Sequence, residues 1–161
     1  MNNNRRFRLL LAPIVVVLGV CASTSAAASP PTEATGTITN TSATFNSVRV
    51  AGSNLVFDLS ATASYTGTFT GTSTLRGRLI VHADGSANFH DIETFTGTVN
   101  GVPGTVTFNL TGSNDAAFAV QETRTIIGAT GELTGLQGVL HEVGTVVIPD
   151  GPVTTYTGKV G

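Results

Sequence analysis

Apolar and polar side chains alternate through residues 57–70, FDLSATASYTGTFT. Phe57, Leu59 and Tyr65 occupy odd positions, whereas Asp58 and a series of serines and threonines occupy the even positions. A period of two residues is typical of a β-strand with one buried face. Since no segment has apolar residues at helical spacing, the sequence predicts an all-β fold.

The dipeptide Asp84-Gly85 predicts a tight hairpin turn that sets the pairing of two strands. Asp-Gly tolerates the positive φ angles of a two-residue type I′ turn. Such a turn pairs Arg76 with Glu93 and Arg78 with Asp91. All four charged side chains then share one face of the sheet.

Two further turns extend this register. Asn100-Gly101 predicts a second type I′ turn, which pairs Glu93 with Phe108. A third turn, placed at Thr70-Gly71, brings Tyr65 to the same group of charges. All three registers assign the same parity to the same face.

That face carries five phenylalanines and is therefore predicted to be the inside. The opposite face is rich in threonine, which suits an exposed β surface. A long sheet with one apolar face and no covering helix can bury that face by closing on itself. We therefore predict one antiparallel β-barrel of about eight strands, with a two-sheet β-sandwich as the alternative. The inward phenylalanines are Phe57, Phe69, Phe89, Phe95 and Phe108.

The same registers place charged side chains inside the barrel, where charges are costly unless paired. One interpretation is a ligand site in which Arg76 and Arg78 hold a carboxylate or enolate oxygen, and Glu93 or Asp91 is the catalytic proton acceptor. The alternative is a ladder of ion pairs on a solvated patch, or a structural buried pair. The predicted ligand-binding residues are Tyr65, Arg76, Arg78, Asp91, Glu93, Phe89, Phe95 and Phe108.

The first 28 residues have the pattern of a secretory signal peptide. Arg5, Arg6 and Arg8 precede an apolar run over residues 9–20, which is too short to cross a bilayer, and small residues follow it. We expect residues 1–28 to be cleaved, residues 29–34 to form a flexible leader, and residues 35–161 to form the barrel. The mature protein is then secreted and has no membrane segment.

The charge of the mature chain disfavours nucleic acid as a partner. The net charge of the full sequence is −2, and it falls by three, to −5, when the three arginines leave with the signal peptide. A surface of this sign repels phosphate backbones. The only cysteine, Cys21, leaves as well, so the mature chain forms no internal disulfide.

Other polar residues receive structural interpretations. His82, His90 and His141 lack the spacing of metal ligands, so we expect no metal site and no other cofactor. Glu122 and Arg124 share one parity of their strand and are interpreted as a solvated pair.

Four glycines fall within residues 128–138, GATGELTGLQG. Glycine accommodates positive φ angles, bulges and close backbone approach. A phosphate-binding loop needs Lys-Ser or Lys-Thr at its end and a helix after it, and this segment has neither. The segment is therefore predicted to form a corner and rim of the barrel.

Three segments together resemble a bacterial family known only as domain of unknown function 3224. They are IETFTGTVNG (residues 92–101), PGTVTFNL (residues 103–110) and the glycine-rich segment GATGELTGLQG. Members of this family resemble the eight-stranded allene oxide cyclase and dirigent barrels. The resemblance implies a barrel and brings no established activity. This chain differs in its export signal and in its threonine-rich first strand.

Three functions stay open at this point. The first is binding of a small apolar or amphipathic ligand in a phenylalanine-lined lumen, with the charged residues fixing its head group. The second is an isomerase or cyclase that uses one carboxylate in an apolar pocket. The third is a structural or interaction protein with a filled barrel. Assembly into a homo-oligomer is compatible with all three.

Overall fold

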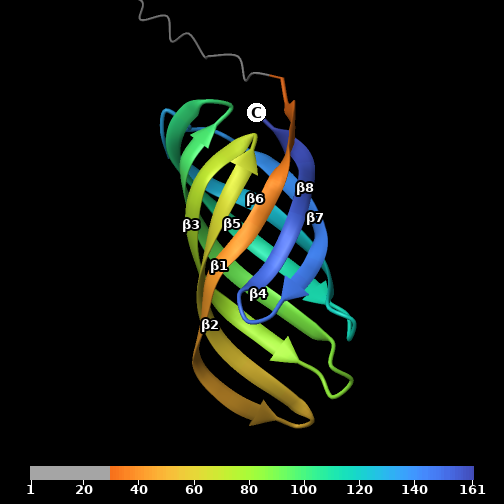
Figure 1. Cartoon of the computed structure of the whole chain (residues 1–161). Coiled ribbons are helices and arrows are strands. Elements are labelled where there is room, and N and C mark those ends of the chain that lie inside the picture. Colours follow the sequence, from red (N-terminus) through yellow and green to blue (C-terminus); the bar gives the residue numbers. More distant parts are fainter. Residues whose placement is uncertain (1–29) are drawn as a thin grey trace, which may run out of the picture.

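Eight antiparallel strands form one closed sheet in the computed structural model, which describes residues 30–161 (Figure 1). Each strand pairs with the next along the chain, and β8 pairs with β1 to close the barrel. The predicted all-β fold of eight antiparallel strands is confirmed, whereas the predicted signal peptide lies outside the described residues. The strands are β1 (Thr32–Ala51), β2 (Asn54–Gly67), β3 (Phe69–Val81), β4 (Ala87–Val99), β5 (Val102–Asn114), β6 (Ala119–Gly131), β7 (Gly138–Val147) and β8 (Gly151–Val160).

The barrel begins earlier than predicted. Thr32 pairs with Val160 of β8, and Ala34 is fully buried. Residues 32–34 therefore belong to the strand that closes the barrel, although the sequence assigned them to a flexible leader. Among residues 30–161, no helix is long and apolar enough to cross a membrane.

The turn at Asn100-Gly101 has the predicted geometry. Asn100 has a φ of 51° and Gly101 a φ of 83°, as a type I′ turn requires. Glu93 consequently pairs with Phe108, as expected.

The turn at Asp84-Gly85 differs from the prediction. The amide of Gly85 donates to the carbonyl of His82, and the amide of His82 donates to the carbonyl of Ser86. Gly85 alone is left-handed, with a φ of 85°. These bonds define a type I turn followed by a left-handed glycine, which is one residue longer than a type I′ turn.

This longer turn reverses the predicted orientation of two arginines. Arg76 pairs with Ile92, and Arg78 pairs with His90. A shift of one residue moves every side chain of a strand to the other face. Both arginines are therefore exposed on the outside of the barrel, and the prediction that they lie inside is wrong.

The turn between β2 and β3 also lies elsewhere than predicted. The chain reverses at Gly67 and Thr68 rather than at Thr70-Gly71, so that Tyr65 pairs with Gly71. Tyr65 faces inward as expected, but its neighbour on β3 is not an arginine.

Aromatic side chains fill one half of the barrel. We call it the upper half, and the C-terminus lies at this end (Figure 1). Phe69, Phe95 and Phe108 are fully buried there, and the rings of Phe69 and Phe95 meet edge to face at 5.5 Å between centroids. Leu133 and Leu136, from the turn between β6 and β7, pack against this cluster. The glycine-rich segment therefore forms a rim and cap, which confirms its structural interpretation.

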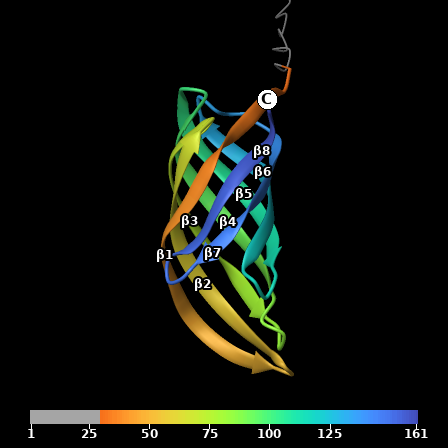
Figure 2. The ribbon, with the colours of Figure 1, turned by 45° about the vertical axis from the view of Figure 1, so that its right-hand side comes forward.

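The opposite end of the barrel interior is less covered. Four apolar side chains face inward there and remain half-buried, and we call them the lower mouth. The hairpin of β1 and β2 extends beyond the other strands at this end (Figures 1 and 2). The lower mouth consists of Phe57, Leu59, Leu79 and Phe89.

Candidate functional site: a buried acidic layer

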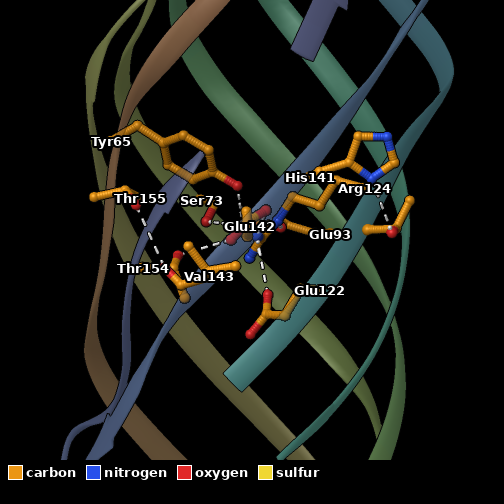
Figure 3. A network of polar contacts seen from close by, with 11 residues as sticks. Tyr65, Ser73, Glu93, Glu122, Arg124, His141, Glu142, Val143, Thr154 and Thr155 are labelled. Atoms are coloured by element: carbon orange, nitrogen blue, oxygen red, sulfur yellow. Dashed lines mark hydrogen bonds and ion pairs between the residues drawn. The ribbon is translucent and has the colours of Figure 1, made fainter. Parts of the chain in front are cut away.

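Four carboxylic side chains and one arginine lie inside the barrel between the upper half and the lower mouth. They sit on β4, β6 and β7, on the inward face that the phenylalanines also occupy, and each is almost entirely buried. Figure 3 shows Glu93, Glu122, Arg124 and Glu142 gathered inside the barrel. Cross-strand pairing brings them together from distant parts of the sequence. We call this group the acidic layer: Asp91, Glu93, Glu122, Arg124 and Glu142.

Glu93 lies at the centre of the acidic layer and accepts hydrogen bonds on both carboxylate oxygens. The Tyr65 hydroxyl and the Ser73 hydroxyl donate to Oε1 at 2.7 and 2.5 Å. Arg124 Nε donates to Oε2 at 2.7 Å. Charge-assisted bonds of this kind are shorter and stronger than hydrogen bonds between neutral groups. Glu93 is thus an anchor of the network rather than a free base.

Arg124 joins the remaining acids of β6 and β7. Its Nη1 donates to Glu122 Oε2 at 3.0 Å and to Glu142 Oε1. Thr154 of β8 donates to the other oxygen of Glu142 at 2.7 Å. The guanidinium carbon also lies 5.9 Å from the centre of the Tyr65 ring, within cation–π range.

Asp91 lies on the side of the acidic layer that faces the lower mouth, two residues before Glu93 on β4. Its side chain is 5% exposed, and its Oδ1 is the one buried side-chain oxygen or nitrogen without a hydrogen-bond partner among the described residues. A side chain on Gly77, its cross-strand neighbour, would collide with this oxygen. A buried acceptor without a donor costs free energy, about 1–3 kcal/mol for a typical group.

One arginine cannot neutralise four carboxylates, and two of the acids, Asp91 and Glu122, have raised pKa values. Burial and the neighbouring Glu93 raise the pKa of Asp91 to about 6. Burial, followed by repulsion from Glu142 and Glu93, raises the pKa of Glu122 to about 8. Glu122 therefore carries a proton at neutral pH, which relieves part of the excess negative charge.

Burial acts in the opposite direction on the cation of the acidic layer. Alone, burial would lower the pKa of Arg124, but the surrounding carboxylates raise it well above its ordinary value. The arginine stays charged and holds the layer together.

The two predicted arginines lie outside this site. Arg78 Nε forms an exposed ion pair with Asp58 Oδ1 at 3.3 Å. Arg76 and Arg78 line a shallow outer groove of about 650 Å³ over β2, β3 and β4, together with His90. They cannot hold a ligand head group inside the barrel as predicted, because the longer hairpin turn directs them to solvent.

The other predicted site residues all face inward, at different levels. Tyr65, Glu93 and Asp91 belong to the acidic network or contact it, and Phe89 lies at the lower mouth. Phe95 and Phe108 are fully buried in the upper half and pack against other side chains rather than lining an open lumen. A role of these residues in binding stays a prediction.

Sequence reasoning missed three of the five residues of the acidic layer. Glu122 and Arg124 are buried rather than solvated, and Glu142 had no assigned role. Their shared inward parity was a usable signal, since Glu122 pairs with Glu142 across β6 and β7. The loop of residues 115–118 between β5 and β6 has no simple turn signature, so the register of β6 could not be fixed in advance.

A hollow of about 500 Å³ opens toward the acids of β6 and β7. Glu122 and Glu142 line it together with Gly112 of β5 and mostly exposed residues of β4, β5, β6 and β7. Within residues 30–161, no cluster of His, Cys, Asp and Glu side chains has the arrangement of a metal site.

Comparison with known proteins places this fold in a family. The sequence profile described as protein of unknown function (DUF3224) matches residues 32–147, from the start of β1 to the end of β7. The crystal structure of a DUF3224 protein of unknown function from Shewanella oneidensis MR-1 is similar, with a TM-score of 0.65 and 18% identity over 82% of this chain and 98% of that chain. This likeness shows a shared fold. No curated protein matches the chain. The chain belongs to the DUF3224 family.

Proposed function

We propose that this protein is a secreted barrel that binds a small amphipathic molecule, whose basic polar group meets the acidic layer at Asp91. The observation that carries this proposal is the buried Asp91 Oδ1 that lacks a donor. It belongs to a layer with four acids and one arginine, so a ligand that brings a donor and a positive charge relieves both deficits.

The lower mouth supports an apolar tail for this ligand. Phe57 pairs with Leu79, and Leu79 pairs with Phe89, so these three side chains form a continuous row across β2, β3 and β4. Gly112 is the next residue of the row, and a side chain there would collide with the Phe89 ring. The side chains of Phe57, Leu79 and Phe89 are only half-buried, and covering them would release water from apolar surface.

The charge of the interior favours a basic head group over an acidic one. The sequence alone suggested that Arg76 and Arg78 hold an anion, but both lie outside. Within residues 30–161 the one inward arginine, Arg124, is fully engaged by Glu93, Glu122 and Glu142. An anionic head group would add to an existing excess of negative charge.

Access to the layer is supported by the hollow of about 500 Å³ that reaches Glu122 and Glu142. The pKa of Glu122, beside this hollow, is raised to about 8, and that of Asp91, on the side of the lower mouth, is raised to about 6. Charge on these groups can therefore adjust to a bound cation.

The finer resemblance to allene oxide cyclase barrels, with an isomerase or cyclase activity, is a second proposal. The raised pKa of Asp91, about 6, suits a proton acceptor that works near neutral pH. Glu93, the other predicted acceptor, has its oxygens occupied by Tyr65, Ser73 and Arg124 and suits this role less well. Binding is the simpler function, because it requires no reacting partner.

A structural role with a filled barrel is favoured by the packing of the upper half. Phe69, Phe95 and Phe108 leave no exposed surface there. The lower mouth favours ligand binding over a structural role. Partly exposed apolar side chains and a buried acceptor without a donor do not stabilise a barrel, whereas a ligand could contact both.

A displacement assay tests the proposed ligand class. A fluorescent apolar probe bound to the protein is titrated with straight-chain amines, alcohols and carboxylates of equal length. We expect the amine to displace the probe at the lowest concentration, and Asp91→Asn to remove this preference while retaining binding of the alcohol. Equal displacement by all three series, or an unchanged preference in Asp91→Asn, would overturn the proposal.

Native mass spectrometry of the protein purified from its producing organism complements this assay. A copurifying basic amphiphile at near-stoichiometric amount supports the proposal. A protein that is empty and also fails to bind the probe supports the structural role.

A further inference from the structure

The lower part of β1 is a free sheet edge. β1 pairs with β8 from Thr32 to Thr39, but it pairs with β2 as far as Ala51. Residues 41–51 thus have a hydrogen-bonded neighbour on one side only. At about 3.3 Å per residue, their unpaired backbone groups extend over about 36 Å. Figures 1 and 2 both show this hairpin projecting beyond the rest of the barrel.

One face of this edge is apolar and exposed. The side chains of Phe45, Val48 and Val50 are 58%, 60% and 74% exposed. They pair with Leu59, Phe57 and Leu55 of β2, so all share the inward-facing surface of the hairpin. Large apolar side chains that gather on one surface indicate an interaction site.

A β-bulge brings these side chains to the same face. The register of β1 shifts between Phe45 and Ser47. In a regular strand, Val48 would lie on the face opposite to Phe45, because the two positions are three residues apart and successive side chains alternate between faces. The irregularity thus assembles the apolar face rather than interrupting it.

The edge lacks proline and lysine, two kinds of residue that protect free edges from pairing, while the two register shifts of β1 are its one protective feature. Monomeric proteins place lysines, prolines and inward-pointing charges on such strands. Residues 41–51, TSATFNSVRVA, contain no proline and no lysine, and Arg49 is their only charged residue.

We propose that this edge pairs antiparallel with the same edge of a second copy, which forms a two-fold dimer through β1. A two-fold axis between Phe45 and Asn46 places Arg49 opposite Ser42 of the other copy. The two Arg49 side chains are then about 24 Å apart along the strands, well beyond the screening length of about 8 Å at physiological ionic strength. A hydroxyl-rich edge with a single charge is compatible with its own copy, whereas it offers little complement to a strongly charged peptide.

The position of the hairpin makes the contact sterically accessible. The β1–β2 hairpin projects away from the closed part of the barrel, so two hairpins can meet along their edges while the barrels stay apart (Figure 2). This dimer does not depend on the proposed ligand, because the free edge lies on the hairpin and not at Asp91.

Sedimentation velocity over a roughly hundredfold range of protein concentration tests the dimer. We expect a concentration-dependent monomer–dimer equilibrium. The double substitution Val48→Lys with Val50→Lys should weaken dimerisation by more than tenfold, because lysines on an edge oppose pairing. The matched control Thr94→Lys, an exposed position in the middle of the sheet, should dimerise like the parent. A parent protein that is monomeric at every concentration would overturn the proposal.

Hydrogen exchange of the unmodified protein tests the edge itself and does not rely on a variant that could fail to fold. The amides of residues 41–51 should gain protection as concentration rises, while those of β3 and β4 stay unchanged. A dimer without concentration-dependent protection of residues 41–51 would show that another surface forms the interface.

Discussion

The interior of this barrel is packed differently in its upper and lower halves. The upper half is filled by Phe69, Phe95, Phe108 and the capping Leu133, which pack without gaps open to solvent. The middle holds the buried acidic layer, and below it the lower mouth stays half-exposed. One sheet thus combines a stabilising core at one end with a polar, incompletely satisfied interior at the other.

This contrast shows which part of the molecule is shaped by stability and which by another requirement. Apolar packing of the kind found in the upper half maximises burial. Four buried acids with one arginine lower stability instead, because each buried charge without a partner costs free energy. Sites that depart from the requirements of folding are where function is expected.

The largest effect is predicted for the cation of the acidic layer. Arg124→Met leaves Glu93 and Glu142 buried without a counter-charge and should lower the free energy of unfolding by about 3–5 kcal/mol. Denaturant unfolding measures this loss. The matched control is Arg76→Met on the exposed outer wall, which should change stability by less than about 0.5 kcal/mol. Equal losses for the two substitutions would contradict the account of the layer.

A smaller difference should separate aromatic residues of the two halves. Phe95→Ala in the upper half creates a buried cavity and should cost about 3 kcal/mol. Phe57→Ala at the lower mouth should cost less than half as much, because this side chain is only half-buried and its site is open to solvent. Thermal or denaturant unfolding of both variants checks the order, and the reverse order would mean that the mouth is part of the stabilising core.

Stability should fall as pH rises through neutrality. Asp91 and Glu122 have pKa values raised from 3.8 to about 6 and from 4.5 to about 8, so the folded state binds more protons than the unfolded state across these ranges. The free energy of unfolding therefore decreases as pH rises through these windows and levels off above about pH 8. The exposed Asp58 and Asp84 have pKa values lowered from 3.8. They act in the opposite direction, because the stability that they contribute is lost as pH falls below 3.8.

The variant Glu122→Gln measures how much of this pH dependence of stability comes from Glu122. The variant keeps the shape of the protonated acid, so it should be more stable than the parent above about pH 8 and similar to it at low pH. Melting temperatures across this range measure the effect, and Glu132→Gln, an exposed acid in the capping turn, is the matched control. A pH profile that Glu122→Gln leaves unchanged would show that Glu122 is not the titrating group.

The smallest effect is predicted on the outside of the barrel. Arg78→Gln breaks an ion pair with Asp58 in which both side chains are about half exposed. Exposed ion pairs contribute little to stability. The unfolding midpoint should stay within experimental error of the parent, and a marked loss would mean that the outer wall is more than a solvated surface.

Alternation along single strands predicted the inward face and its phenylalanines correctly. The turn at Asn100-Gly101 also set its register, because both residues adopt the positive φ angles that the dipeptide favours. The same reasoning was wrong at Asp84-Gly85, where Asp-Gly also suits a longer turn. One extra residue sufficed to move Arg76 and Arg78 from the inside to the outside.

The acidic layer could be predicted only in part. Asp91 and Glu93 followed from the alternation of β4, whereas the contact of Glu93 with Arg124 depends on the register of β6 across the irregular loop of residues 115–118. The free edge of β1 was beyond prediction for a similar reason. It exists because β1 continues beyond the end of its pairing with β8, and the sequence carries no signal for that difference in length.

Ligand-induced changes in the NMR spectrum test the central claim that the two halves have different tasks. The isotope-labelled protein is titrated with a straight-chain amine, and methyl and aromatic resonances are followed. We predict saturable shifts at Phe57, Leu79, Phe89 and the neighbours of Asp91, with Phe69, Phe95 and Leu133 unchanged. Shifts centred on the upper half, or no saturable shifts at the lower mouth, would contradict the proposed binding site.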